Sequence, residues 1–99
     1  MRISTDHRQA LRQHFQAALG DGCEVLVFGS RLNDAGRGGD VDLLVKSAIP
    51  LQRKEWLASL LAVQAQRILD GRQVDVLLVD PQTSLQAVHR VAMETGVAL

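Results

Sequence analysis

The sequence predicts a small α/β domain of the α+β kind, in which helices cover a mixed sheet of three to four strands. Two observations predict it. Apolar residues recur at helical spacing in three segments, and short runs rich in β-branched residues lie between them. The chain has 99 residues, 46% apolar and 22% charged, which suits one soluble domain over residues 1–99 with a single core. The expected order is α-β-β-α-β-α, with a final short strand or tail.

The first helix is expected over about residues 5–19. Ser4 or Thr5 can cap its start, and Gly20 suits its end because glycine adopts the left-handed conformation readily. Its apolar residues fall on one face at helical spacing: Leu11, Phe15, Ala18 and Leu19.

Two further helices follow the same signals. The second is expected over about 51–69, with Pro50 at its start and Asp70-Gly71 at its end. The third is opened by Pro81 and Ser84 and ends at Gly96.

Strands are expected at 23–28, 40–45 and 73–79, with 97–99 as an edge strand or a tail. A polar, glycine-rich loop joins the first two strands, and its length favours antiparallel neighbours over a crossover. The second helix is long enough to carry a crossover from 40–45 to 73–79. A mixed sheet follows.

Charge and cysteine content exclude several classes of protein. The 11 basic and 11 acidic residues give a net charge of zero, which argues against stable, non-specific nucleic-acid binding. One cysteine excludes an intrachain disulfide and a cysteine metal cage, and it suits the cytoplasm. Apolar runs of four or five residues are far below the about 20 that cross a membrane. The first residues lack the apolar segment of a signal peptide. We therefore expect a cytoplasmic protein.

Asp40 and Asp42 flank Val41 inside the second expected strand. Because strand side chains alternate, both carboxylates point the same way, with Cα atoms about 6.6 Å apart. Two such acids repel, and a divalent cation is their most economical partner. Asp75 stands between two valines of the third strand and is expected on the same side. Three acids on two strands match a two-metal phosphoryl-transfer site; the alternative is solvent-facing acids on half-exposed strands.

The residues that follow the first strand suit a phosphate group. Gly29 allows close backbone approach, and the N–H groups after it can bind an anion. The Ser30 hydroxyl can donate to a phosphate oxygen. Arg31 and Arg37 are candidates to neutralise a triphosphate, and a solvated loop charge is an equal interpretation of both.

Together these features resemble the nucleotidyltransferase superfamily of the DNA polymerase β type. The stretches that carry the resemblance are Gly29-Ser30-Arg31, Asp40-Val41-Asp42-Leu43 after a spacing of nine residues, and Val74-Asp75-Val76. It covers about residues 5–99. The short length is similar to the minimal nucleotidyltransferase (MNT) branch, which includes the antitoxins of HEPN/MNT toxin–antitoxin pairs. Gly39 stands where the family often has serine, which leaves the acids unchanged.

That resemblance implies a nucleotidyltransferase fold and a division of roles. Gly29 and Ser30 would hold the nucleotide phosphates. Asp40 and Asp42 would bind two Mg²⁺ ions, with Mn²⁺ as an alternative metal, and Asp75 would bind the ion nearer the acceptor. The reaction would move a nucleoside monophosphate, AMP from ATP, to a hydroxyl group. In the toxin–antitoxin members this hydroxyl belongs to a tyrosine of the HEPN ribonuclease partner, which adenylylation silences.

Other reactive residue types have plainer interpretations. His7, His14 and His89 are expected at the surface or its boundary, and Cys23 as a small buried side chain. Trp56 on the second helix is most simply a core residue, and the alternative is an anchor for a partner.

The sequence leaves three hypotheses. The first is a Mg²⁺-dependent transferase that acts as an antitoxin on a HEPN partner, and the three intact acids favour it. The second is the same fold masking its partner sterically without catalysis. The third is transfer to a small molecule such as an aminoglycoside. Because the second helix is broadly apolar, we also expect a homodimer or a complex with a separate helical partner.

Overall fold

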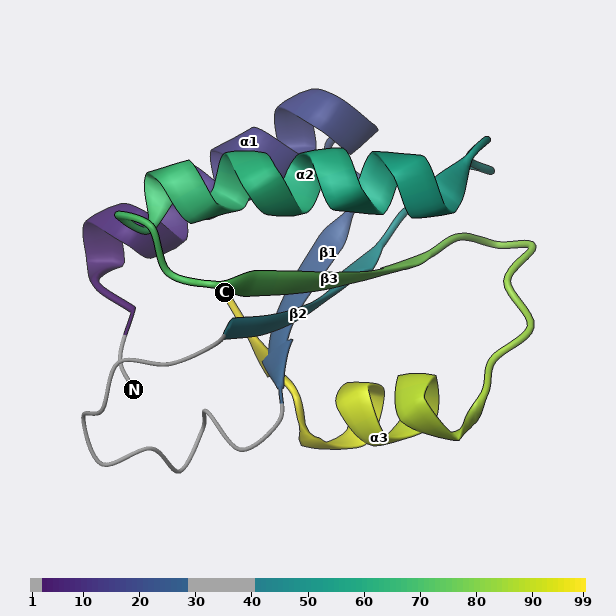
Figure 1. The fold of residues 1–99 in the computed structure, drawn as a ribbon. Helices are drawn as coiled ribbons and strands as arrows, with labels where there is room; N and C mark the ends of the chain where they lie inside the picture. The colour runs from purple at the N-terminus through teal and green to yellow at the C-terminus, as the bar shows by residue number, and fades with distance from the viewer. Residues whose placement is uncertain (1–2, 29–40) are drawn as a thin grey trace.

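The computed structural model describes residues 3–28 and 41–99. These residues form α1 (Thr5–Leu19), β1 (Glu24–Phe28), β2 (Val41–Lys46), α2 (Lys54–Ile68), β3 (Val74–Val79), α3 (Ala87–Thr95) and β4 (Val97–Ala98), as Figure 1 shows. The order is the expected one, and the last segment is a strand rather than a tail. In the described part of the chain, no helix is both long and apolar enough to cross a membrane.

The strands form one mixed sheet in the spatial order β3-β2-β1-β4. β1 pairs antiparallel with both β2 and β4, whereas β2 and β3 are parallel. A parallel pair needs a crossover, and α2 provides it. The predicted antiparallel pairing and the predicted crossover are both confirmed.

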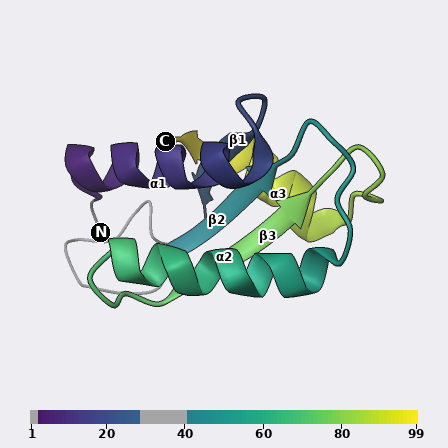
Figure 2. The same ribbon diagram turned by 90° about the horizontal axis from the view of Figure 1, so that it is seen from above.

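The helices lie on both faces of the sheet. α1 and α2 lie side by side on one face, and α3 covers the other (Figures 1 and 2). The larger core lies between the sheet and the α1/α2 layer, and its fully buried side chains include Leu11, Phe15, Leu43, Leu61 and Val74. A smaller core on the α3 side contains Leu44, Val79 and Ala92.

The ends of α1 are set by its local sequence, as predicted. The Ser4 hydroxyl accepts a hydrogen bond from the His7 N–H at 3.1 Å, which caps the start. Gly20 ends the helix at φ 93°, a backbone conformation that residues other than glycine rarely adopt. The buried face contains Leu11, Phe15 and Leu19; Ala18, which was expected on that face, is exposed.

The start of α2 differs from the prediction. The helix begins at Lys54 rather than near 51, so Pro50 is not its first residue. The Leu51 N–H donates to the Asp80 carboxylate at 2.8 Å, which holds this segment in a loop against the end of β3. Arg53 then enters the helix from a left-handed conformation at φ 52°.

The start of α3 also differs. The helix begins at Ala87, later than Pro81 and Ser84 suggested. The Thr83 hydroxyl donates to the Asp80 carboxylate at 3.0 Å, and the Asp80 N–H donates back to that hydroxyl at 2.9 Å. This turn takes up the residues that were expected to open the helix.

Candidate functional site at the end of the sheet

Three strands reach the same level at one end of the sheet. Phe28, the last residue of β1, pairs in register with Asp42 on β2. Asp42 in turn pairs with Asp75 on the parallel strand β3. Gly29 and Ser30 come next after Phe28 in the sequence. The register therefore brings two of the predicted metal ligands together where the predicted phosphate-binding dipeptide begins.

Asp42 and Asp75 project from the same face of the sheet. Their neighbours Val41, Leu43 and Val74 are buried in the larger core, and side chains alternate along a strand, so both carboxylates face the α3 side. Neighbouring strands lie about 4.8 Å apart, which lets two adjacent carboxylates share one cation. The expectation that Asp75 faces the same side as Asp42 is confirmed.

The corner of the sheet that holds these acids is accessible. β3 is an edge strand, and α3 packs on β1 and β2. Asp75 is accordingly exposed, and Asp42 is half-buried. A ligand can reach this corner from solvent. Glu24 lies on the same face of the sheet as Asp42, at the opposite end of β1 beside Lys46. It is therefore a suitable control position for variants of the acid pair.

The remaining predicted site residues, Gly29, Ser30, Arg31, Arg37 and Asp40, lie outside the described residues. Within residues 3–28 and 41–99, no three histidine, cysteine or acidic side chains come together as metal ligands. Asp42 and Asp75 therefore form a pair, and the three-acid site remains a prediction that depends on Asp40.

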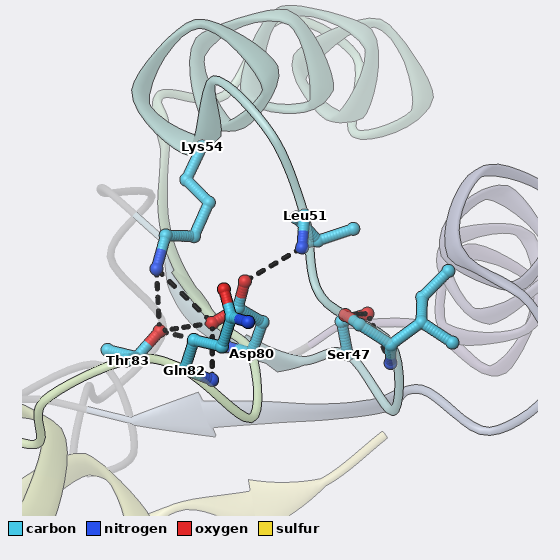
Figure 3. Close-up of polar contacts among 7 residues, drawn as sticks. Ser47, Leu51, Lys54, Asp80, Gln82 and Thr83 are labelled. Atoms are coloured by element: carbon cyan, nitrogen blue, oxygen red, sulfur yellow. Dashed lines mark hydrogen bonds and ion pairs between the residues drawn. The ribbon is translucent and has the colours of Figure 1, made fainter.

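A second polar cluster, at the other end of β3, was missed in the sequence (Figure 3). Asp80 is only 5% exposed. Its carboxylate accepts hydrogen bonds from the N–H groups of Leu51 at 2.8 Å and Gln82 at 3.0 Å, from the Thr83 hydroxyl at 3.0 Å and from Lys54 Nζ at 3.2 Å. These donors, the Leu51 N–H foremost, lower the pKa of Asp80 to about 2.

This Asp80 cluster has a structural role. It ties the loop before α2 to the end of β3, with the charge of Lys54 as partner. It lies about 16 Å along β3 from Asp75, five residues at about 3.3 Å each, which separates it from the acid pair. The signal in the sequence is an acid after a strand, three residues before a threonine, which is typical of a turn closed by side-chain hydrogen bonds.

The histidines lie at the surface or its boundary, as expected, whereas Cys23 is half-buried rather than buried. His7 lies 3.4 Å from the Asp70 carboxylate at the surface, and His89 Nδ1 accepts the Gln86 N–H at the start of α3. Burial lowers the pKa of His14, which favours the neutral ring. Burial also raises the pKa of the Cys23 thiol, which favours the thiol over the thiolate.

The position of Trp56 contradicts the prediction that it is a core residue. Its side chain is 56% exposed on the outer face of α2. Leu57 and Leu61 of the same helix pack into the core instead. The alternative interpretation, an anchor for a partner, is the one that its position allows.

The mixed four-stranded sheet with helices on both faces is consistent with a nucleotidyltransferase fold, and adjacent strands carry acids at one end of it. Comparison with known families supports the same class: the family model of the nucleotidyltransferase domain matches residues 5–98. The chain therefore belongs to the nucleotidyltransferase domain family. This membership supports nucleotidyl transfer as its general activity and a nucleoside triphosphate as substrate. A comparison with curated proteins finds no match.

Proposed function

We propose that this chain is a Mg²⁺-dependent nucleotidyltransferase that moves AMP from ATP to a hydroxyl acceptor. The observation that carries the proposal is the register of Phe28, Asp42 and Asp75 across three neighbouring strands. It puts an acid pair beside the residue after which the predicted phosphate-binding dipeptide begins.

The donor chemistry of this corner fits a hard divalent cation. Carboxylate oxygens are the protein ligands that Mg²⁺ and Mn²⁺ prefer, and Mg²⁺ keeps several waters and takes its other ligands from phosphates. Asp42 and Asp75 would hold the metal together with Asp40. Two bound ions would neutralise the triphosphate and lower the pKa of the acceptor hydroxyl.

The chain's own residues then divide the remaining work. Gly29 and Ser30 would position the phosphates through backbone N–H groups and a hydroxyl, and Arg31 and Arg37 would offset their charge. The acceptor oxygen bonds to the α-phosphorus while the bond to the bridging oxygen breaks. Pyrophosphate leaves with that electron pair, and the Asp75 carboxylate would accept the hydroxyl proton and pass it to water.

The acceptor that we propose is a tyrosine of a HEPN-domain protein, so that the chain acts as an antitoxin. The support is the likeness of the motifs to those of minimal nucleotidyltransferases. The chain itself contains no tyrosine, so a tyrosine-directed enzyme of this kind needs a second molecule. A protein that only masks its partner is the alternative, and the exposed apolar face of α2 suits it equally.

An assay of transfer from labelled ATP distinguishes the transferase from the masking protein. The acceptors are a purified HEPN-domain protein and a tyrosine-containing peptide, with the modified residue located by mass spectrometry. Asp42→Asn or Asp75→Asn should reduce transfer about 100-fold or more, because each removes a charged group that acts in the transition state. Circular dichroism should remain unchanged.

The matched control is Glu24→Gln, which neutralises an acid on the same face at the far end of β1 and should transfer at the unsubstituted rate. Transfer at the unsubstituted rate by Asp42→Asn and Asp75→Asn would contradict the assignment of these two acids to the reaction. No transfer by the unsubstituted chain with Mg²⁺ present would favour the masking protein.

A further inference from the structure

α2 carries an apolar stripe on its outer face. Trp56, Leu60 and Val63 are 56%, 38% and 48% exposed. Their spacing of four and three residues puts them on one side of the helix, away from Leu61 and Ala65 in the core. Large apolar side chains that are exposed together on one side of a helix are typical of an interaction site.

Arginines stand at both ends of this stripe. Arg67 follows Val63 by four residues and so shares the stripe's side of the helix. Arg53, the residue before the helix, lies beside Trp56 through a contact with its ring. The two arginines are separated by 14 residues, or about 21 Å along the axis. The Arg53 guanidinium lies 5.1 Å from the centre of the Trp56 ring, which holds the indole against the start of the helix. Part of the surface is therefore ordered before any partner arrives.

This charge pattern disfavours a second copy of the chain. If two α2 helices paired antiparallel about Leu60, Arg53 of each copy would face Arg67 of the other, because both lie seven residues from Leu60. In a parallel pair, each arginine would face its own counterpart. Like charges then meet at both ends in both of these arrangements, which opposes self-association through this stripe.

We propose that the outer face of α2 docks a helical segment of a partner protein that carries an apolar stripe with a carboxylate near each end. Trp56 supplies the buried anchor, and the two arginines fix the register through charge. Docking here is independent of nucleotidyl transfer, because α2 covers the opposite face of the sheet from Asp42 and Asp75. Failure of one proposal therefore leaves the other standing.

The chain's single tryptophan makes the test direct, since Trp56 emission reports on this face alone. The probe is a designed helical hairpin peptide without tryptophan, with a leucine stripe and glutamates about 21 Å apart. Titration into the full chain should shift the emission to shorter wavelength and saturate. A peptide with lysines in place of the glutamates should bind at least about tenfold more weakly, and about 0.5 M salt should reduce this difference.

Charge reversal supplies the matched variants. The double variant Arg53→Glu with Arg67→Glu should no longer bind the glutamate peptide and should bind the lysine peptide instead. Binding of the lysine peptide also shows that the variant is folded. Arg90→Glu, an exposed position on α3, should behave as the unsubstituted chain. The proposal is overturned if the glutamate peptide leaves the emission unchanged or if both peptides bind equally. It is also overturned if the chain alone sediments as a dimer and its Trp56 emission moves to shorter wavelength as the dimer forms.

Discussion

At the scale of single residues, Asp80 is the clearest case of a charge that the fold stabilises. Its carboxylate is removed from solvent, yet four donors satisfy it, and the Lys54 ammonium group compensates its charge. Because hydrogen bonds to the ionised form favour that form, the pKa falls from 3.8 to about 2. Protonation of Asp80 therefore couples to folding.

We predict an acid-dependent loss of stability that Asp80 causes. A folded-state pKa below the unfolded value stabilises the protein above about pH 3.8, and this contribution is lost as the pH falls toward 2. Asp80→Asn should lower the urea midpoint at neutral pH and flatten its decline over that pH range. Lys54→Met removes one donor only and should have the smaller effect. An unchanged pH profile in Asp80→Asn would contradict this assignment.

The sequence predicts a residue's environment well where the signal is local and poorly where it depends on distant partners. Alternation along the strands correctly put Asp42 and Asp75 on one face. The role of Asp80 was not predictable in the same way, because Leu51 and Lys54 are 29 and 26 positions away. Trp56 was misassigned because α2 is apolar on several sides, so residue type alone does not tell the core face from the outer one.

At the scale of elements, the helix starts also differ in whether local residues or distant partners determine them. The first helix has its own cap in Ser4, and its bounds were predicted correctly. The other two start later than proline suggested, because the Asp80 cluster holds the loop between β2 and α2 and the turn after β3 outside the helices. Proline permits a helix start but does not require one.

The junction between α3 and β4 depends on the small size of Gly96. A Cβ atom there would lie 2.5 Å from the Ala92 carbonyl oxygen and 3.0 Å from Leu26 Cβ. Its φ of −71° is ordinary, so the constraint is space alone. We predict that Gly96→Ala destabilises the protein by about 1–3 kcal/mol in urea unfolding, the usual cost of overpacking.

Thr95→Ala, one residue earlier and exposed, serves as the control and should stay within about 0.5 kcal/mol of the unsubstituted protein. If Gly96→Ala unfolds at the same urea concentration as this control, the junction between α3 and β4 accepts a Cβ atom, and the predicted steric constraint at Gly96 is wrong.

At the scale of the whole molecule, the order of elements, the antiparallel start and the crossover were all readable from the sequence, because loop lengths and helix periodicity restrict a small sheet strongly. The register between the strands could not be predicted from the sequence. Only the structure puts Phe28, Asp42 and Asp75 at one level. This register puts two of the three motifs side by side, next to the residue after which the third begins in the sequence.

The most direct measurement of this central claim is paramagnetic broadening of backbone amide signals by substoichiometric Mn²⁺ in the presence of ATP. Signals of Phe28, Asp42 and Asp75 should broaden first, and those of Glu24 and Asp80, at the far end of the sheet, last. Asp42→Asn should weaken the broadening, whereas Glu24→Gln should not. Broadening centred on Asp80, or spread evenly over the sheet, would contradict a metal–nucleotide site at the Asp42 and Asp75 corner.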